Sequence, residues 1–275
     1  MKHIGALDKV AVPTVNSGSG NNAPMIAGFA PTFTLVGGIN KPQNELNAQE
    51  TDGVVRMQLV KAKDDLRQDA VMEQVFEMVN TLLRECSSPR AAWRRELGVR
   101  SYKVVPLSPS AGLVEWVQNT VALGEYLTGT PAAPGQGAHV RYNPGDLLPA
   151  ECRKRMAEAH ESRDKSVRAR AFGDVCNHFT PVFHHFFLEN FHTPADWFMR
   201  RLAFTRSSAA SSIVGYILGL GDRHSQNILI DKATAEVIHI DLGVAFDQGK
   251  ALKTPEVVPF RLTRDVVDGM GGEWA

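Results

Sequence analysis

The order of apolar and polar positions divides the chain into a strand-rich first part and a helical second part. Residues 54–62 (VVRMQLVKA) alternate as a half-buried strand does, and Lys61 ends the face that carries the apolar side chains. Shorter apolar runs bounded by turn residues predict further strands at 10–15 and 33–36, and two more within 102–117. The first 120 or so residues are therefore predicted to form a small, strand-rich lobe.

Helical periodicity first appears near residue 69. Apolar residues follow one stripe from 71 to 83, and Asp69 stands at the start of this predicted helix, where a negative charge suits the helix dipole. After a turn-rich stretch at 131–137, residues 151–172 predict an exposed, charged helix or helix pair. Residues 179–221 predict further helices, with enough apolar residues to build a second core.

The composition is that of a globular protein. Of 275 residues, 43% are hydrophobic and 22% are charged, so a sizeable core can be buried. Thirty basic and thirty acidic residues give a formal charge of zero, which argues against binding to a nucleic-acid backbone as the main role. No run has the length of a signal peptide core or a membrane span, so we expect a soluble intracellular protein without membrane contact.

Two groups of potential metal ligands form no metal motif. The three cysteines lack a C-x-x-C spacing, so they predict neither a zinc site nor a disulfide framework and favour a reducing compartment: Cys86, Cys152 and Cys176. Four histidines lie among phenylalanines without nearby carboxylates or cysteines, which favours helix packing or exposure over metal binding: His178, His184, His185 and His192.

The densest group of chemically active residues is the stretch GLGDRHSQNIL at 219–229. An apolar helix ends in glycines just before it, so Asp222, His224 and Asn227 are predicted to lie in a loop. Two short strands at 227–231 and 236–241 then form a hairpin that brings Asp241 near Asn227.

An asparagine and an aspartate presented together offer the hard oxygen ligands that suit Mg²⁺ holding nucleotide phosphates. Asp222 precedes Asn227 by five residues, which matches the Asp-to-Asn interval of the protein-kinase catalytic loop, although the order of His, Arg and Asp is inverted. A turn closed by a salt bridge would explain DRH alone. The combination with Asn227 and the strand-end Asp241 favours phosphoryl transfer.

The inverted motif carries a family resemblance. GDRHSQN followed by HIDLGVAF resembles the catalytic loop and the metal motif of the phosphatidylinositol-kinase-like superfamily, and residues 58–76 resemble its lysine strand and the helix that follows. Segments 102–116, 211–224 and 254–271 are most similar to the ATM (ataxia telangiectasia mutated) branch of the phosphatidylinositol 3-kinase-related protein kinases.

The resemblance covers about residues 10–271 and implies an α+β, bilobal kinase-like fold. It implies a small lobe at 1–118 with an antiparallel sheet and a helix, and a larger, mainly helical lobe at 119–275. The catalytic loop would be 219–227 and the activation segment 241–264. Relatives continue through further helices, so we expect that C-terminal helices of the large lobe are missing.

The resemblance also implies a role for each polar residue of the site. Lys61 resembles the lysine that contacts ATP phosphates, with Asp64 near it and Asp69 as its acidic partner on the helix. A lysine whose ammonium group merely reaches solvent is the alternative. Asp222 resembles the residue that orients the substrate hydroxyl, and His224 the one that assists proton removal or stabilises the transferring phosphoryl group. Asn227 and Asp241 resemble the Mg²⁺ ligands.

The adenine base would occupy an apolar slot between the lobes. Glu115, Trp116 and Val117 resemble the hinge, and Tyr102 and Ile240 the walls, with Leu229 as the floor. Each of these residues alone would more often be part of a core. The resemblance puts the phosphate loop near 23–29, where only Gly28 favours it, and Gly37–Gly38 is read as a hairpin turn.

The segment after Asp241 indicates the substrate class. It carries only Lys250 and Lys253 before Pro259, too few for a clamp on inositol phosphates, and 258–264 resembles protein kinases that favour Ser or Thr followed by Gln. The hypothesis is a nuclear Ser/Thr protein kinase in DNA-damage signalling, which uses ATP and Mg²⁺ and meets DNA-damage sensor complexes. A lipid kinase and a truncated, inactive binding module are the alternatives.

Overall fold

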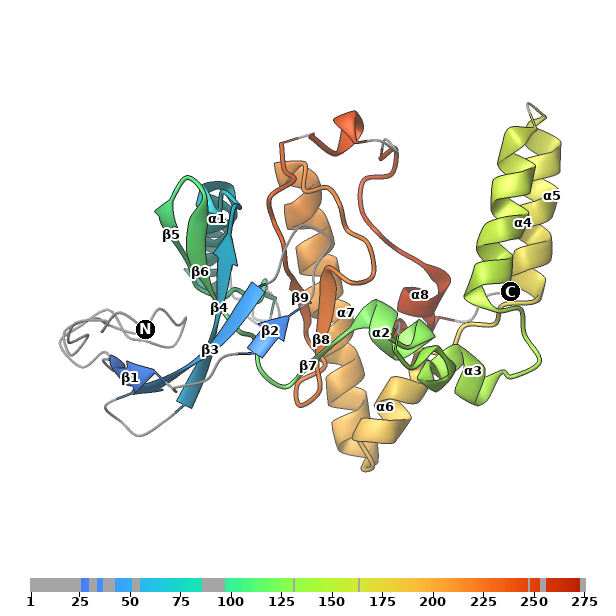
Figure 1. Ribbon diagram of the computed structural model, residues 1–275. Coiled ribbons are helices and arrows are strands. Elements are labelled where there is room, and N and C mark those ends of the chain that lie inside the picture. Colours follow the sequence, from blue (N-terminus) through green and yellow to red (C-terminus); the bar gives the residue numbers. More distant parts are fainter. Residues whose placement is uncertain are drawn as a thin grey trace. The chain divides into compact units, whose positions relative to one another are not determined.

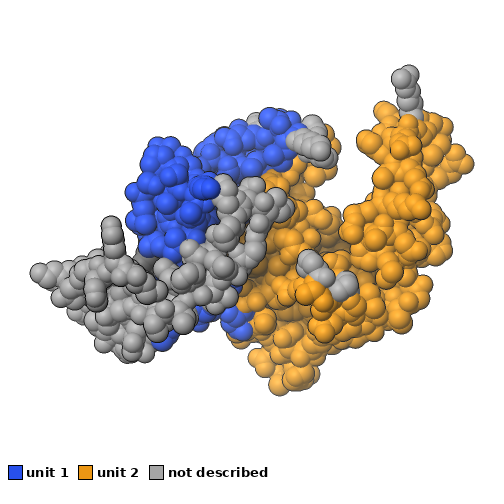
Figure 2. All heavy atoms as spheres, viewed as in Figure 1, with its two compact units in different colours: residues 1–119, 217–221, 241–255 blue, residues 120–216, 222–240, 256–275 orange. Residues whose placement is uncertain are grey.

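The computed structural model describes residues 26–29, 34–36, 43–50, 55–85, 97–130, 132–162, 164–246, 248–252 and 256–272. These residues form two compact units, coloured blue and orange in Figure 2. The first unit comprises Met1–Asn119, Ile217–Gly221 and Asp241–Pro255. The second unit comprises Thr120–Tyr216, Asp222–Ile240 and Glu256–Ala275. The strand expected at 10–15 and the turn at Gly37–Gly38 lie outside the described residues.

The first unit is built on an antiparallel sheet, which has six strands among the described residues, in the order β1-β3-β4-β6-β5 with β2 on β3 (Figure 1). The strands are β1 (Ile26–Phe29), β2 (Thr34–Val36), β3 (Gln43–Glu50), β4 (Val55–Ala62), β5 (Val104–Ser108) and β6 (Ala111–Glu115). The strands expected at 33–36, 54–62 and within 102–117 are confirmed. Strand β3, QNELNAQE, was not predicted, because its polar sequence has no alternation of apolar and polar residues.

Strand β4 lies between β3 and β6, and this interior position changes its burial pattern. Leu59 is buried as the alternation predicts, but the next residue, Gln58, is buried as well, with 2% of its surface exposed. Side chains of neighbouring strand residues point to opposite faces, so the middle of β4 is covered on both faces.

Helix α1 (Arg67–Glu85) packs beside β5 in the first unit (Figure 1). Met72 and Phe76 are buried on its inner face, as the apolar stripe predicts. The Asn80 side chain donates to the Val99 carbonyl and accepts from the Val99 N–H, both at 2.8 Å, which fastens the helix to the chain before β5.

The second unit is mainly helical with a small sheet. Its helices are α2 (Leu123–Thr128), η2 (Pro134–Gln136), α3 (Ala138–Tyr142), α4 (Pro149–Glu161), α5 (Lys165–Asn177), α6 (His184–Asn190), α7 (Pro194–Leu218) and α8 (Arg264–Met270). Its antiparallel strands are β7 (Thr120–Ala122), β8 (Ile228–Asp231) and β9 (Val237–His239). A short helix, η3 (Gln248–Ala251), belongs to the first unit.

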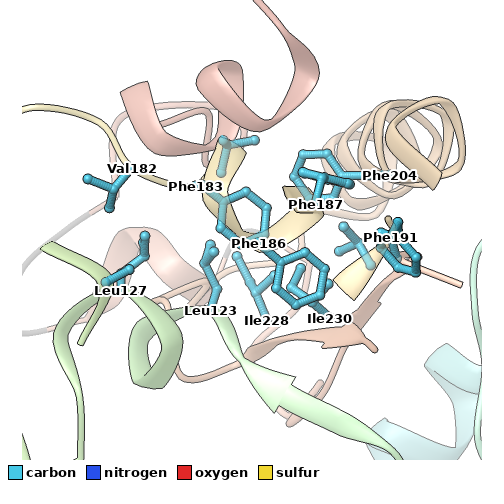
Figure 3. Packing of buried hydrophobic residues seen from close by; sticks show 14 residues of the cluster. Leu123, Leu127, Val182, Phe183, Phe186, Phe187, Phe191, Phe204, Ile228 and Ile230 are labelled. Carbon is cyan, nitrogen blue, oxygen red and sulfur yellow. The ribbon is translucent and has the colours of Figure 1, made fainter. Parts of the chain in front are cut away.

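An aromatic cluster forms the core of the second unit (Figure 3). Phe183, Phe186 and Phe187 from α6 and the turn before it are fully buried, and the rings of Phe183 and Phe187 contact Phe204 of α7. The Phe187 and Phe204 rings meet edge to face with centroids 5.6 Å apart, a favoured geometry for aromatic pairs. Helix α7 is tied to the small sheet as well, because Ser207 Oγ accepts the Val237 N–H at 3.0 Å.

The charged segment at 151–172 is a helix pair, α4 and α5, which lie side by side (Figure 1). Arg155 of α4 and Asp174 of α5 form an ion pair across it. Cys152 and Cys176 are free thiols. Within the described part of the chain, no helix is both long and apolar enough to cross a membrane.

Candidate active site

The lysine strand and the segment after β9 meet inside the first unit. Lys61 lies at the end of β4, and its Nζ is 3.2 Å from Asp241 Oδ1 and 3.7 Å from Asp64 Oδ2. The Lys61 side chain is 11% exposed, whereas Asp241 and Asp64 are about half exposed, at 53% and 52%. The ammonium group is therefore shared by two carboxylates that remain open to solvent, rather than reaching solvent alone.

The start of α1 holds the backbone that follows Asp241. The Leu242 N–H donates to Asp69 Oδ1 at 2.8 Å, and Gln68 Nε2 donates to the Gly243 carbonyl at 2.8 Å. Burial raises the pKa of Asp69, against the opposing effects of the Leu242 hydrogen bond and the Lys61 charge. The hydrogen bond of Asp69 thus goes to the backbone at Leu242, while Asp64 and Asp241 are the carboxylates at Lys61.

The residues expected to line an adenine pocket from the first unit surround the ends of β5 and β6. Tyr102 is buried, and its N–H donates to Glu73 Oε2 at 3.1 Å. The Glu115 carboxylate accepts the Lys103 N–H at 2.9 Å, and the Trp116 N–H donates to the Met57 carbonyl at 3.1 Å. Val117 follows, partly buried, before the chain enters the second unit at Thr120.

The predicted catalytic loop follows α7, and Gly219 adopts a left-handed φ of 61° directly after the helix. Asp222 also has a left-handed backbone, with φ of 57°. Its N–H donates to Glu256 Oε1 at 2.9 Å, and its carbonyl accepts from Asn227 Nδ2 at 3.0 Å. Asp222 and Asn227 are therefore joined within the second unit, with Asp222 partly exposed and Asn227 buried.

Arg223 is the residue of this loop to which the sequence assigned no role. Its side chain is buried, and Nη1 donates to the Ile240 carbonyl at 2.7 Å, with the Asn227 carbonyl at 3.4 Å. The Ile240 N–H in turn donates to the Asn227 carbonyl at 3.1 Å. Arg223 thus fastens the loop to the end of the β8–β9 hairpin, and its position inside the DRH triplet was the only available signal.

His224 is exposed, and its Nδ1 accepts the Gln226 N–H at 3.3 Å, which leaves Nε2 as the ring atom that carries a proton. Leu229 lies in β8 between Ala122 of β7 and Ile238 of β9, and both Leu229 and Ile240 are partly buried. The hairpin expected at 227–241 is confirmed.

The structure therefore gathers the predicted polar residues in two groups, one in each unit. Lys61, Asp64, Asp69 and Asp241 belong to the first group, and Asp222, His224 and Asn227 to the second. Asp241 directly follows Ile240 in the chain. The sharing of one metal ion by Asn227 and Asp241 spans the two units and stays a prediction.

The available donors fit a hard cation bound together with phosphates. Asn227 offers an amide oxygen and Asp241 a half-exposed carboxylate. Among the described residues, no group of three or more His, Cys, Asp or Glu side chains is arranged to hold a metal by itself. Mg²⁺ is typically held by one or two protein oxygens and completes its shell with water and nucleotide phosphates, so this small set is suitable.

Comparison with known proteins identifies the family. Residues 58–274 match the family described as phosphatidylinositol 3- and 4-kinase, and this range contains the predicted catalytic, metal-binding and adenine-pocket residues but not the phosphate loop expected near 23–29. The chain is 55% identical over 249 residues to the serine/threonine-protein kinase ATM of Arabidopsis thaliana, covering 90% of this chain and 6% of the relative. It is 52% identical over 270 residues to the serine-protein kinase ATM of Sus scrofa, covering 96% of this chain and 8% of the relative.

Solved structures agree. The FAT and kinase domain of CtTel1 superposes with a TM-score of 0.83 at 46% identity, covering 95% of this chain and 18% of that chain. The chain belongs to the phosphatidylinositol 3- and 4-kinase family and has its kinase fold, so the predicted family and the α+β kinase-like fold are confirmed. It spans less than a tenth of the length of the two ATM relatives.

Proposed function

We propose that the chain is the catalytic part of a Ser/Thr protein kinase that transfers the γ-phosphate of ATP to Ser or Thr in proteins, preferring a following Gln. The observation that carries the proposal is the Lys61–Asp241 pair at 3.2 Å, because it combines a cation for phosphates with a carboxylate for a metal. Relatives about 50% identical bear the names of serine and serine/threonine-protein kinases, which supports the protein substrate.

In this proposal Lys61 binds the ATP phosphates, and Asp64 helps to position the Lys61 ammonium group. Asn227 and Asp241 hold Mg²⁺, which neutralises charge on the transferring phosphoryl group when bound. Asp69 holds the Leu242 backbone and thereby fixes the segment that starts with Asp241. Phosphoryl transfer depends mostly on positioning and charge neutralisation, so this set is chemically sufficient.

The second unit would supply the groups that act on the acceptor. Asp222 orients the Ser or Thr hydroxyl and accepts its hydrogen bond. His224, with its Nε2 proton, donates to the transferring phosphoryl group; assisting proton removal, the alternative role, would require Nε2 without its proton. Arg223 lies between Asp222 and His224 in the chain. Its side chain holds this backbone against the hairpin by donating to the Ile240 and Asn227 carbonyls.

The base would bind between a small lobe at 1–118 and a large lobe at 119–275. Glu115, Trp116 and Val117 form the hinge, and the apolar walls and floor come from Tyr102, Ile240 and Leu229. The catalytic loop is 219–227 and the activation segment 241–264. Partners are proteins with Ser-Gln or Thr-Gln sites and, by the resemblance to the ATM branch, DNA-damage sensor complexes in the nucleus.

The test is phosphate transfer from labelled ATP to a Ser-Gln peptide, the matched Ser-Ala peptide and phosphatidylinositol. We expect the chain to label the Ser-Gln peptide most strongly, and Asp241→Ala to lose about 100-fold or more of that activity, because a metal ligand is removed. Asp174→Ala, which changes an aspartate of α5 in the helix pair, is the matched control and should keep it.

Three results would contradict the proposal in different ways. Labelling of phosphatidylinositol without peptide labelling would indicate a lipid kinase. Equal labelling of both peptides would remove the Gln preference alone. Equal background signals from the chain and Asp241→Ala, with retained binding of the nucleotide, would indicate an inactive binding module.

A further inference from the structure

The backbone of Asp222 is in an unfavourable conformation. Its φ of 57° lies in the left-handed region. Residues other than glycine rarely adopt this region, because their Cβ comes too close to the backbone. Such residues persist where surrounding contacts hold them, and they concentrate at functional sites. The question is which contacts hold Asp222.

Two hydrogen bonds fix the peptide groups on either side of the Asp222 Cα. The N–H donates to Glu256 Oε1 at 2.9 Å, and the carbonyl accepts from Asn227 Nδ2 at 3.0 Å. With both peptide groups held, the direction of the Asp222 Cα–Cβ bond, from which the side chain extends, is held too. Asn227 is local, but Glu256 lies 34 residues further along the chain.

The segment that carries Glu256 touches the loop a second time and is anchored at its far end. Arg261 Nη1 approaches the Arg223 carbonyl at 3.4 Å. Three residues later, Arg264 Nη1 donates to the Cys176 carbonyl at 2.9 Å. The segment therefore runs from the catalytic loop to a fixed attachment in the second unit.

Helix α8 strengthens that attachment. Asp265 Oδ1 accepts the Val182 N–H at 2.8 Å, and Asp265 Oδ2 lies 3.2 Å from Nε2 of the buried His139. Asp268 accepts from the backbone and the ring of His184. The end of the segment is thus held in the second unit by buried and partly buried polar contacts, while Glu256 and Arg261 contact the catalytic loop nearer its start.

We infer that Glu256 is a positioning residue for the proposed phosphoryl transfer: its carboxylate holds the Asp222 peptide in the left-handed conformation from which the Asp222 side chain acts. A hydrogen bond from a backbone N–H to a carboxylate is charge-assisted and therefore strong. The segment expected to meet the acceptor would then also set the catalytic loop. This inference rests on the proposed function.

The test compares Glu256→Ala with Glu256→Gln, because glutamine keeps an Oε1 acceptor in the same place and alanine removes it. We expect kcat for the Ser-Gln peptide to fall about tenfold or more in Glu256→Ala, with KM for ATP within about twofold, since positioning acts on the chemical step. Glu256→Gln should stay within about threefold of the parent. Glu158→Ala, on the exposed face of α4, is the control and should change neither constant.

A second measurement separates positioning from general structural damage. On an Asp222→Ala background, Glu256→Ala should cause no further loss of kcat, because residues that act as a unit are not additive. Hydrogen exchange at the Asp222 amide gives a readout that needs no catalysis. It should speed up about tenfold or more in Glu256→Ala and remain slow in Glu256→Gln.

Several outcomes would overturn the inference while the proposed function stands. They are an unchanged kcat in Glu256→Ala, a further loss on the Asp222→Ala background, a raised peptide KM with normal kcat, and unchanged exchange at the Asp222 amide. Absence of peptide phosphorylation by the parent chain would instead remove the proposed function, and the catalytic part of the inference with it.

Discussion

The interiors of the two units differ in what lies at their centres. The second unit buries a cluster of phenylalanines, with Phe183, Phe186, Phe187 and Phe204 at its centre. The first unit buries apolar side chains too, but beside them it hides Gln58, Asp69 and Glu73. The second unit also buries two acids, Asp231 and Asp265, but neither belongs to the aromatic cluster, whereas Asp69 and Glu73 both lie on α1.

Buried acids destabilise a fold unless hydrogen bonds or cations compensate. Burial, together with the charges of Asp69, Glu77 and Glu115 and against the Tyr102 hydrogen bond, raises the pKa of Glu73 to about 9. Glu73 therefore holds its proton at neutral pH. In the first unit a buried acid, Asp69, accepts a backbone hydrogen bond at Leu242, whereas aromatic packing fills the centre of the second unit.

The largest expected effect comes from the aromatic cluster. Phe187→Ala removes a fully buried ring that contacts other phenylalanines, so the free energy of unfolding should fall by about 3–5 kcal/mol at any pH. Urea unfolding measures it. Phe172→Ala is the control, because Phe172 is 58% exposed, and a similar loss there would contradict the assignment of the core to the cluster.

Glu73→Gln tests the first unit. In the parent chain, the folded state keeps the Glu73 proton up to a pKa of about 9, whereas the unfolded state loses it near the ordinary value of 4.5. The unfolded state therefore binds fewer protons between these values, and stability should fall as pH rises, by up to about 1.4 kcal/mol for each pH unit.

The neutral glutamine should remove this slope and stabilise the chain at pH 8. Urea unfolding at pH 5.5, 7 and 8.5 measures the effect. Glu85→Gln, at the exposed end of the same helix, is the matched control and should keep the slope of the parent. An identical slope in Glu73→Gln would mean that Glu73 is already ionised in the folded chain.

The tightness of the aromatic core can be tested by adding one methyl group. A Cβ at Gly269 in α8 would lie 2.4 Å from Phe183 Cδ1, so Gly269→Ala should destabilise by about 1–3 kcal/mol through overpacking. A Cβ at Gly173 in α5 would have no atom within 4 Å. Gly173→Ala should therefore stabilise the fold by up to about 1 kcal/mol, because alanine favours a helix. Thermal unfolding of both variants measures the contrast, and equal shifts would show a loosely packed core.

The smallest effect is expected on the surface of the helix pair. Arg155 and Asp174 form an ion pair with side chains 45% and 47% exposed. Exposed pairs contribute about 0.2–1 kcal/mol and are screened by salt, so a double-mutant cycle with Arg155→Ala and Asp174→Ala should give a coupling in this range. A coupling above about 2 kcal/mol that persists in 1 M salt would place this pair with the buried ones.

The pattern of apolar and polar residues predicted many of the helices and strands, because the signal for each lies in its own residues. The stripe of α1 and the alternation of β4 are examples, and the polar β3 shows the limit, since its strand state depends on pairing with β4 rather than on its own side chains. The burial of Gln58 left no local signal either, because it depends on what packs over that face of β4 and not on the alternation within the strand.

The same distinction applies to the site residues: some are recognised from their spacing in the sequence and others only from contacts in the structure. The interval from Asp222 to Asn227 and the end of the strand before Asp241 are readable along the chain. Glu256 was missed because its partner is 34 residues away, and Arg223 because its main acceptor, the Ile240 carbonyl, is reached only after the hairpin forms.

Motif spacing and periodicity are local properties, so they were enough to indicate the family, many of the strands and helices, and the residue types available for chemistry. Two contacts are visible only in the tertiary structure. Lys61 meets Asp241, 180 residues further along the chain, and Asp69 accepts the N–H of Leu242, 173 residues further along. Contacts of that range depend on how whole elements pack, which no local pattern of side chains records.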